Sequence, residues 1–349
     1  MKTKAAVQPA FGQTFVLDEL DVPDPGPGQA LVKLISTGVC HSQIHQMHNP
    51  ALPRPWLLGH EATGVVTGVG PRVTHLKEGD LAIVTWVPRT PFRGRKPLET
   101  VGVKYRGQPA HGIVYAWAED VLADADLVVR IPDDSPTDVT CIVGCAVLTG
   151  AGAVMHTARV RPEESVAVFG VGGVGLCALQ TAALLQAYPV IAVDLADDKL
   201  EFAREFGATH TVNASKVDPV EAIVDITGGG ADYVFDAVGV KATMEQILPA
   251  TRGGGPGADN HGGMAVLIGY PMEKITIDPG NFMFHQRQYR GSLGATHADT
   301  DFPMFLRWYQ EGKFPLDKLV TRRYRFDQLH EACEALERGE ILGRAIVEL

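Results

Sequence analysis

The chain has 349 residues, of which 45% are hydrophobic and 21% charged, and it carries a formal net charge of −10 at pH 7. This length allows two domains with separate cores, the acidic balance argues against nucleic acid or an anionic membrane as the main partner, and no apolar run is long enough to span a bilayer. Its five cysteines form an odd, scattered set, which argues against a disulfide framework and makes the reducing cytoplasm the expected location.

Residues 1–150 are predicted to form strands and turns. Residues 1–7 lack the apolar core of a signal peptide and are expected to form the first strand. Further apolar runs, at residues 30–35, 64–69 and 81–87, are bounded by clusters of Pro, Gly and Asp. This spacing predicts a barrel-like, all-β domain.

After residue 162 the pattern changes to alternating strands and helices. A short apolar strand at residues 165–169 is followed by the run Gly170-Val171-Gly172-Gly173-Val174-Gly175 and by a helix at residues 176–185. The alternation continues with strands at residues 190–193, 233–236 and 264–268 and with helices at residues 199–206 and 241–248. Such alternation predicts an α/β domain built on a parallel, doubly wound sheet. From about residue 291 the chain leaves this pattern.

The glycine run has the context that dinucleotide binding requires, because it follows a strand, opens a helix, and precedes Asp194 at the end of the next strand. Gly170 would make the turn, Gly172 would let the backbone approach a pyrophosphate, and Gly175 would allow close packing of helix on strand. The phosphates would meet the positive N-terminus of the helix, beside Gly173 and Val174. Asp194 would bind the adenosine ribose and repel a 2′-phosphate, which favours NAD over NADP. A domain of this kind that binds another nucleotide is the alternative.

The residues from Gly59 to Gly70 form a second glycine-rich segment, which contains His60 and Glu61. In an extended segment these two neighbouring side chains point to opposite faces, so one can bind a metal while the other supports the site or enters it transiently. Together with the upstream thiol of Cys40, an imidazole suits a borderline divalent metal, with zinc the first choice. For an isolated His-Glu pair, a solvated loop is the alternative.

Three motifs together resemble those of the zinc-containing medium-chain alcohol dehydrogenases: Gly59-His60-Glu61 with its glycine spacing, the run from Cys40 to His45, and Cys145 before Thr149-Gly150. The resemblance covers essentially the whole chain. It implies a GroES-like, β-rich catalytic domain at residues 1–150 and 291–349 and an NAD-binding Rossmann domain at residues 151–290. It also implies a zinc- and NAD-dependent enzyme that reversibly oxidises primary or secondary alcohols to aldehydes or ketones.

The resemblance selects the metal ligands. Cys141 and Cys145 lie one helical turn apart, so spacing alone allows both to bind one metal. By the resemblance, Cys40, His60 and Cys145 hold one catalytic zinc and leave a fourth position open, and Cys141 is a buried core thiol. Glu61 would lie behind the metal, where it can replace the open-site ligand during exchange. The zinc would act as a Lewis acid on an alcohol or carbonyl oxygen.

The resemblance also implies a proton relay and further cofactor contacts. Ser42 would take the alcohol proton and pass it through the nicotinamide ribose to His45, roles that suit a hydroxyl and an imidazole titrating near neutrality. Thr149 would face the nicotinamide and His41 the pyrophosphate. Three more residues are assigned to the cofactor: Lys199 near the adenosine ribose, Arg344 at the pyrophosphate, and Ile268. Without the resemblance, Lys199 and Arg344 would be interpreted as surface charges, and a surface imidazole would be an equal alternative for His45.

Two features depart from the family pattern. Gln43 stands where the family usually has Asp, so we expect a more electrophilic and less firmly held metal. The four closely spaced cysteines that hold a structural zinc in many relatives are missing, so one zinc per subunit is expected. The corresponding region, residues 89–112, is interpreted as a solvated basic loop rather than an anion site, and its basic residues are Arg89, Arg93, Arg95, Lys96, Lys104 and Arg106.

The substrate pocket and the assembly are the least determined features. Trp86 and Trp117 match pocket-lining positions of the family and would narrow the pocket around an apolar or aromatic alcohol or aldehyde, with ordinary core packing as the alternative. A homodimer or homotetramer is expected. Three other functions are kept as alternatives: a nicotinoprotein alcohol/aldehyde oxidoreductase that holds its cofactor tightly, a zinc-free reductase, and a non-enzymatic nucleotide-binding protein.

Overall fold

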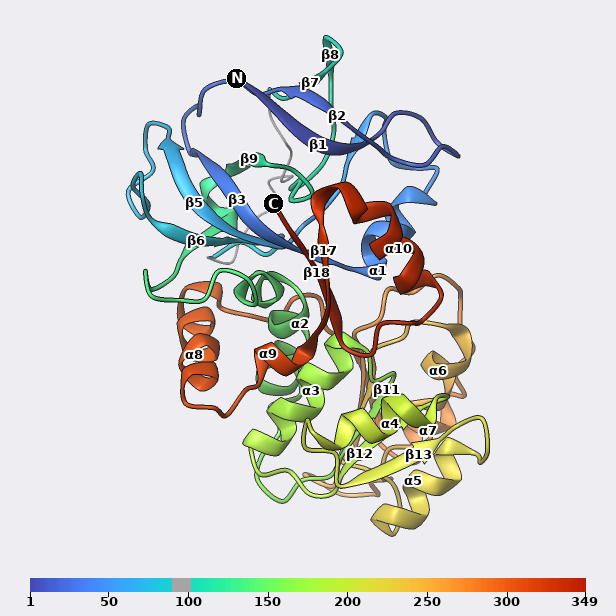
Figure 1. Cartoon of the computed structure of the whole chain (residues 1–349). Helices are drawn as coiled ribbons and strands as arrows, with labels where there is room; N and C mark the ends of the chain where they lie inside the picture. The colour runs from blue at the N-terminus through green and yellow to red at the C-terminus, as the bar shows by residue number, and fades with distance from the viewer. Residues whose placement is uncertain (90–101) are drawn as a thin grey trace. The chain divides into compact units, whose positions relative to one another are not determined.

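The computed structural model describes residues 1–89 and 102–349 of the chain (Figure 1). These residues fold into two compact units. The first combines Met1–Cys145 with His297–Leu349, and the second is Ala146–Thr296. Within the described residues, no helix has both the length and the apolar character needed to cross a membrane.

The described residues of the first unit form two sheets. The smaller sheet has the strand order β4 (Trp56–Leu57), β1 (Lys2–Gln8), β2 (Val16–Asp21), β7 (Lys104–Tyr105) and β8 (Gln108–Pro109). The larger has the order β10 (Val128–Arg130), β6 (Leu81–Val84), β5 (Ala62–Val69), β3 (Gln29–Val39), β18 (Arg344–Glu348) and β17 (Val320–Arg325), with β9 (Asp120–Asp124) paired to β3. The expectation of a β-rich domain is confirmed.

Strand β3 organises the first unit because it pairs with β5, β9 and β18. Its side chains alternate between faces, so Ala30, Val32 and Leu34 all enter the core. In the pairing with β18, Ala345 lies opposite Val39. The last strand of the chain is thereby placed beside the residue that precedes the first cysteine.

Helices α1 (His41–Met47), α8 (Ala298–Gln310), α9 (Leu316–Leu319) and α10 (Leu329–Glu337) complete this unit. On α10, Leu329, Cys333 and Leu336 have the spacing of one amphipathic face, and all three are buried. This face packs with Ile44 of α1 in one apolar cluster, and the two helices lie side by side in Figure 1. The packing fixes α1, the helix that follows Cys40.

The second unit is a parallel sheet flanked by helices. Its strand order is β13 (His210–Asn213), β12 (Val190–Asp194), β11 (Val166–Phe169), β14 (Tyr233–Asp236), β15 (Met264–Leu267) and β16 (Gln288–Gly291), and each neighbouring pair is parallel. The helices are α2 (Ala146–Gly152), α3 (Gly173–Leu184), α4 (Asp197–Arg204), α5 (Pro219–Thr227), α6 (Lys241–Gln246) and α7 (Gly280–Met283). In chain order the strands run 3-2-1-4-5-6, which is the doubly wound arrangement that the alternation predicted.

Candidate active site

Three candidate metal ligands from separate segments lie together in the first unit. Cys40 stands between β3 and α1, His60 precedes β5, and Cys145 follows the 3-10 turn Thr140–Gly144. Their ligand atoms all lie within 4.8 Å of one another. The structure thus brings together the three residues that the motifs selected.

The position of His60 depends on the glycine before it. Gly59 has φ +93°, in the left-handed region that favours glycine, and its α-carbon faces the backbone of Ala116 and Trp117. The N–H of Trp117 donates to the carbonyl of Leu58 at 3.0 Å, which holds the two segments together. A side chain at position 59 has no room, so the turn that presents His60 requires glycine.

Buried threonines fix the turn that carries Cys145. The hydroxyl of Thr85, just after β6, donates to the carbonyl of Gly144 at 2.7 Å. The hydroxyls of Thr63 on β5 and Thr140 in the turn lie 2.8 Å apart. All three threonines are fully buried. Their role was not predictable from the sequence, because a single buried hydroxyl leaves no periodic pattern there.

The two neighbouring cysteines differ in their chemistry. The pKa of the Cys40 thiol is held well below its usual range by its hydrogen bond with Cys145, against the effect of burial, with help from the charge of Arg344. Burial raises the pKa of Cys141 to about 12, and its thiol donates to the carbonyl of Asp138 at 3.2 Å. Cys141 is therefore a protonated core thiol, whereas the Cys40–Cys145 pair favours the thiolate form that metals bind.

Glu61 and Arg344 form an ion pair beside this cluster. A guanidinium nitrogen of Arg344 contacts Glu61 Oε1, and Glu61 is fully buried while Arg344 is 5% exposed. Among the described residues, Glu61 Oε2 has no hydrogen-bond partner. Two thiols, an imidazole and a nearby carboxylate oxygen without a partner form a donor set that fits zinc. The family resemblance implies a cofactor contact for Arg344, and its contact with Glu61 was not predicted from the sequence.

Helix α1 presents two polar side chains, Ser42 and Gln43, next to the cluster. The Ser42 hydroxyl donates to Cys40 Sγ at 3.4 Å, and Gln43 Oε1 accepts the Gly59 N–H at 2.6 Å. Gln43 Nε2 contacts His60 Nδ1. His45 is half-buried one turn along the helix, and the exposed ring of His41 lies 6.4 Å from that of His45.

The far end of α1 is held by Arg54 from the following loop and by Trp56 at the start of β4. Arg54 donates to the carbonyls of Gln46 and Asn49 at 3.4 and 3.2 Å, and Trp56 Nε1 donates to Gln46 Oε1 at 3.0 Å. Neither residue was singled out by the sequence analysis. Both keep Ser42 and His45 in register with the ligands, because they fix the helix that carries them.

The glycine loop of the second unit has the geometry of a phosphate cradle. Gly170 has φ +83°, and a Cβ on Gly175 would collide with the Gly170 carbonyl. Helix α3 has Gly172 as its N-cap, which supplies no side chain to its first N–H groups. Nothing lies within 4 Å of the place where a Cβ on Gly172 would sit. This open, uncapped N-terminus, which includes Gly173 and Val174, fits a pyrophosphate.

Other candidate cofactor residues of this unit are placed as follows. Asp194 ends β12, and its Oδ2 accepts the N–H of Val171 at 3.0 Å, so the carboxylate also supports the loop. Ile268 follows β15 at the same carboxyl edge of the sheet, where its N–H donates to the Asp236 carbonyl at 2.9 Å. Lys199 is half-buried on α4. Thr149, on α2, has a buried hydroxyl that lacks a partner among the described residues.

Asp236 is a residue of this edge that the sequence analysis missed. It ends β14, is fully buried, and burial raises the pKa of its carboxyl. Its Oδ1 accepts the N–H groups of Val238 and Gly239 at 2.7 and 3.0 Å. Asp236 therefore shapes the loop after β14. The sequence pattern that could have indicated this residue is an acidic side chain at the end of a strand of a parallel sheet.

The two candidate pocket tryptophans have different surroundings. Trp117 has no exposed surface, its Nε1 donates to the Gly38 carbonyl at 3.0 Å, and it packs in the core cluster near Phe15. Core packing accounts for all of these contacts. Trp86 is half-buried after β6, and its Nε1 is buried without a partner among the described residues.

The basic region is only partly described, because Arg93, Arg95 and Lys96 lie outside the described residues. Arg89 forms a bidentate ion pair with Asp299, in which its Nε donates to Oδ1 at 2.9 Å and a terminal guanidinium nitrogen donates to Oδ2 at 2.6 Å. Arg106 pairs with Asp18 at 2.8 Å, and Lys104 is exposed on β7. Both ion pairs are partly exposed to solvent, as in a solvated loop.

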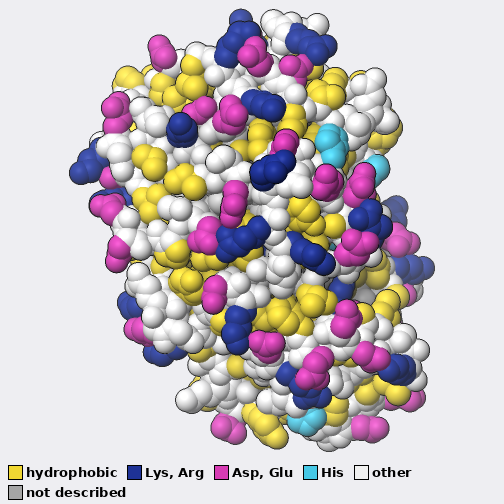
Figure 2. Space-filling view, in the orientation of Figure 1, with side chains coloured by type: hydrophobic (Ala, Val, Ile, Leu, Met, Phe, Trp, Pro, Cys, Tyr) yellow, Lys and Arg dark blue, Asp and Glu magenta, His cyan; other side chains and the backbone are white. Residues whose placement is uncertain are grey.

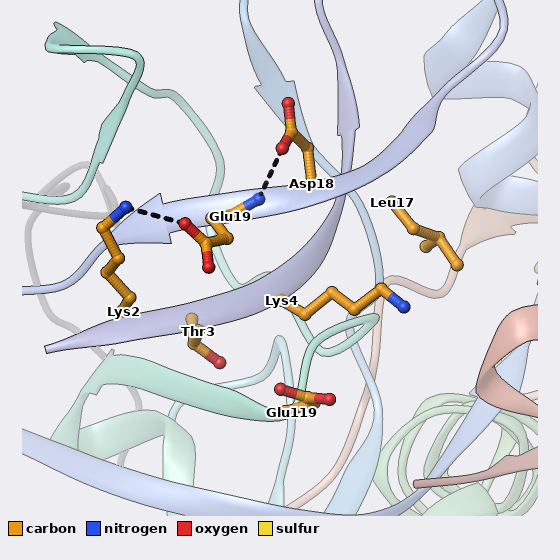
Figure 3. A pocket seen from close by; sticks show the side chains of 7 residues that line it. All are labelled: Lys2, Thr3, Lys4, Leu17, Asp18, Glu19 and Glu119. Atoms are coloured by element: carbon orange, nitrogen blue, oxygen red, sulfur yellow. Dashed lines mark hydrogen bonds and ion pairs between the residues drawn. The ribbon is translucent and has the colours of Figure 1, made fainter.

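A separate hollow lies over β1 and β2 (Figure 3). It is lined by Lys2, Thr3, Lys4, Leu17, Asp18, Glu19 and Glu119. The Lys2 ammonium donates to Glu19 at 2.7 Å, and Asp18 accepts the Glu19 N–H at 2.9 Å. Lys2 and Glu19 form an ion pair with each other, and none of the candidate site residues lines the hollow, so we assign it no role.

Comparison with known proteins identifies the family. The family model for the Alcohol dehydrogenase GroES-like domain matches residues 26–133, and the model for the Zinc-binding dehydrogenase matches residues 173–311. Alcohol dehydrogenase 1 of Pisum sativum is 30% identical, over 100% of this chain and 97% of its own. The chain belongs to the zinc-containing medium-chain alcohol dehydrogenase family. This membership confirms the expected pairing of a GroES-like domain with a Rossmann domain.

Two further relatives cover almost all of this family member. An NDMA-dependent alcohol dehydrogenase of Amycolatopsis methanolica is 32% identical, over 99% of each chain. Among solved structures, the benzyl alcohol dehydrogenase of Acinetobacter calcoaceticus matches with a TM-score of 0.88 at 28% identity, over 100% of this chain and 99% of the other. The enzyme is therefore an oxidoreductase of a family whose cofactors are zinc and NAD.

Proposed function

We propose that the enzyme reversibly oxidises primary or secondary alcohols to aldehydes or ketones. The observation that carries this proposal is the cluster of Cys40, His60 and Cys145 in a chain of this family. Bound there, zinc would supply a Lewis acid for the substrate oxygen, while NAD accepts the hydride. Each turnover of the alcohol then releases one proton, which residues of the chain must remove.

Ser42 and His45 are the groups that we assign to this proton. The Ser42 hydroxyl lies 3.4 Å from Cys40 Sγ, beside the ligand cluster, where it can accept a hydrogen bond from the substrate hydroxyl. His45 lies one turn further along α1, at the half-exposed side. A hydroxyl cannot hold the proton, whereas an imidazole can hold it and release it to water.

Alcohol oxidation is expected to fall as the pH drops through a midpoint below 6.5. Burial lowers the pKa of His45 from its ordinary value of 6.5; the charge of Cys40 opposes this shift and that of His48 adds to it. His45 accepts a proton in its neutral form, which is the main form above this pKa. His45→Gln should remove this acidic limb, the fall in rate at low pH, from the pH–rate profile. It should also lower the rate at neutral pH about tenfold or more.

The matched control for this variant is His48→Gln, which removes an imidazole next to the same helix. We expect it to keep the acidic limb, with a slightly higher midpoint. An acidic limb that persists in His45→Gln would exclude His45 as the acceptor.

Asp194 is expected to determine the preference for NAD. A 2′-phosphate next to this carboxylate would face a like charge, and unit charges about 4 Å apart near a protein surface repel by up to about 4 kcal/mol. Asp194→Asn keeps an acceptor of the same size but removes the charge. We expect the ratio of kcat/KM for NADP to that for NAD to rise at least about tenfold, a change of about 1.4 kcal/mol.

The control is Asp197→Asn, on the adjacent helix. Asp197 is exposed and pairs with Lys216 at 2.6 Å, so its replacement should leave the cofactor ratio unchanged. Equal ratios in the wild type and both variants would contradict the role of Asp194.

We propose an apolar or aromatic alcohol as the substrate. The half-buried indole of Trp86 supports this class, as does the likeness to a benzyl alcohol dehydrogenase. A panel of aliphatic, benzylic and secondary alcohols, assayed with NAD and with NADP beside zinc quantification, tests the substrate and both cofactors. A failure to oxidise any of these alcohols with zinc bound would reject the proposed function.

A nicotinoprotein is the second candidate, because the Amycolatopsis relative is named for its dependence on NDMA. Such an enzyme would hold its cofactor through turnover and regenerate it with a second substrate. Dialysis, followed by denaturation and quantification of the released NAD, distinguishes an enzyme with an exchangeable cofactor from a nicotinoprotein. One cofactor per chain after dialysis would favour the nicotinoprotein.

We also propose that the enzyme is a cytoplasmic homodimer or homotetramer. Strand β16 ends its sheet, so among the described residues one of its edges has no strand beside it. The nearby Met283 and Phe284 are each 74% exposed, which suits a surface that a second copy covers. On the face in Figure 2, acidic and basic side chains are interspersed rather than gathered into a basic patch, which fits a small-molecule substrate better than nucleic acid.

A further inference from the structure

Gln43 joins a metal ligand to the turn that carries it. The side chain is buried, with 2% of its surface exposed. Its Oε1 accepts the Gly59 N–H at 2.6 Å, and its Nε2 contacts His60 Nδ1. Both ends of one carboxamide are therefore committed, one to the backbone and the other to the imidazole.

This arrangement determines which nitrogen of His60 is left for a metal. Nδ1 is occupied by Gln43, so Nε2 is the ring nitrogen that can bind zinc. A neutral imidazole that gives Nε2 to a metal carries its proton on Nδ1. The metal-bound site thus directs two N–H donors at Gln43, one from Gly59 and one from His60.

A glutamine cannot accept from both donors with separate atoms. It has one carbonyl oxygen, and its NH2 group only donates. When Oε1 accepts from the Gly59 N–H, the NH2 group of Gln43 faces the Nδ1–H of His60, so two donors meet. When the amide is turned over, Oε1 accepts from His60, and the NH2 group faces the Gly59 N–H instead. Without the metal, the imidazole proton can sit on Nε2, and Nδ1 then accepts from the amide. In the metal-free site each of these two contacts of Gln43 can pair a donor with an acceptor, whereas in the loaded site one of them brings two donors together.

We propose that Gln43 is a positioning residue that makes the catalytic zinc exchangeable. A buried donor without an acceptor is costly, so the loaded state is disfavoured relative to a site with a carboxylate, whose two oxygens accept from both donors. The zinc content of this enzyme then follows the zinc supply. The inference deepens the proposed function, because it rests on zinc binding at Cys40, His60 and Cys145.

The test is the rate at which zinc-loaded enzyme loses its metal to a chelator, without alcohol or NAD. Gln43→Glu keeps the chain length and supplies two acceptor oxygens. Because partners that orient a ligand typically change metal affinity about 10- to 100-fold, we expect zinc loss to be at least about tenfold slower in this variant. Gln43→Asp, with a shorter carboxylate, is the second variant and decides the question if Gln43→Glu does not fold.

Gln46→Glu is the matched control. It places the same charge one turn further along α1 and keeps an acceptor for Trp56 Nε1, which lies 3.0 Å from Gln46 Oε1. Its zinc loss should match that of the wild type. Equal rates in the wild type and both Gln43 variants would overturn the inference, and so would equal slowing by Gln46→Glu, which would show a general charge effect. A wild type that binds no zinc would instead overturn the proposed function.

Discussion

Cys145→Ser is expected to lose zinc and to lower kcat for alcohol oxidation by about 1,000-fold or more. Cys145 belongs to the three-residue cluster, and removing one of its two thiols leaves a poor zinc site. A Lewis acid contributes several kcal/mol to the stabilisation of charge on the substrate oxygen. A loss of about 4 kcal/mol corresponds to about 1,000-fold in rate. Zinc per chain, measured by atomic emission, and the initial rate of NADH formation are the two readouts.

Cys141→Ser is the matched control, four residues earlier in the same buried turn. Its serine hydroxyl can still donate to the Asp138 carbonyl, which accepts from the Cys141 thiol at 3.2 Å. We expect full zinc content and nearly unchanged kcat, because a thiol with a pKa of about 12 is not a thiolate at neutral pH. Zinc retained by Cys145→Ser, or lost equally from both variants, would show that the ligand assignment is wrong.

The ligand cluster was accessible from the sequence because each ligand lies in a short motif. Cys40 and Ser42 are two residues apart at a strand-to-helix junction, and His60 follows a glycine with a left-handed backbone. The long-range contacts were not accessible in this way. Arg344 reaches Glu61 across 283 residues, and Thr85 reaches Gly144 across 59. Such pairs depend on strand register, which local patterns do not encode.

For the fold, too, local sequence patterns predicted some elements, whereas elements that depend on tertiary packing were missed. The alternation of apolar strands and helices predicted the parallel sheet, because its strands are buried on both faces. Helix α5 was missed: its residues Val220, Ile223 and Ile226 are β-branched and have low helix propensity. The sequence nevertheless encodes both ends of this helix. Asp218 caps its first turn, and Gly228 ends the helix in the left-handed conformation. Capping and packing outweigh propensity here.

Gly59→Ala is expected to destabilise the first unit by about 3 kcal/mol or more and to reduce its zinc content. The backbone φ of +93° costs an L-residue about 1 kcal/mol or more. The added Cβ would also fall against the Trp117 nitrogen and 2.6 Å from the Ala116 carbonyl carbon. Overpacking of this kind typically costs about 1–3 kcal/mol. The neighbouring backbone cannot move away without breaking the hydrogen bond from Trp117 to Leu58.

Gly79→Ala separates the two contributions to this loss. Gly79 has a similar φ, +89°, but nothing lies within 4 Å of the Cβ that alanine would add. It should therefore show the backbone cost alone, about 1 kcal/mol, and keep its zinc. All four tryptophans, Trp56, Trp86, Trp117 and Trp308, belong to the first unit, so urea unfolding followed by tryptophan fluorescence reports on that unit.

The zinc content links this stability difference to the active site. The Gly59 N–H donates to Gln43, and His60 is the next residue, so a turn displaced by the new Cβ moves a ligand and its supporting amide together. We expect Gly59→Ala to lose zinc to a chelator faster than Gly79→Ala does. If the two variants lost equal stability and equal zinc, the close approach of residues 116–117 would have no part in holding His60.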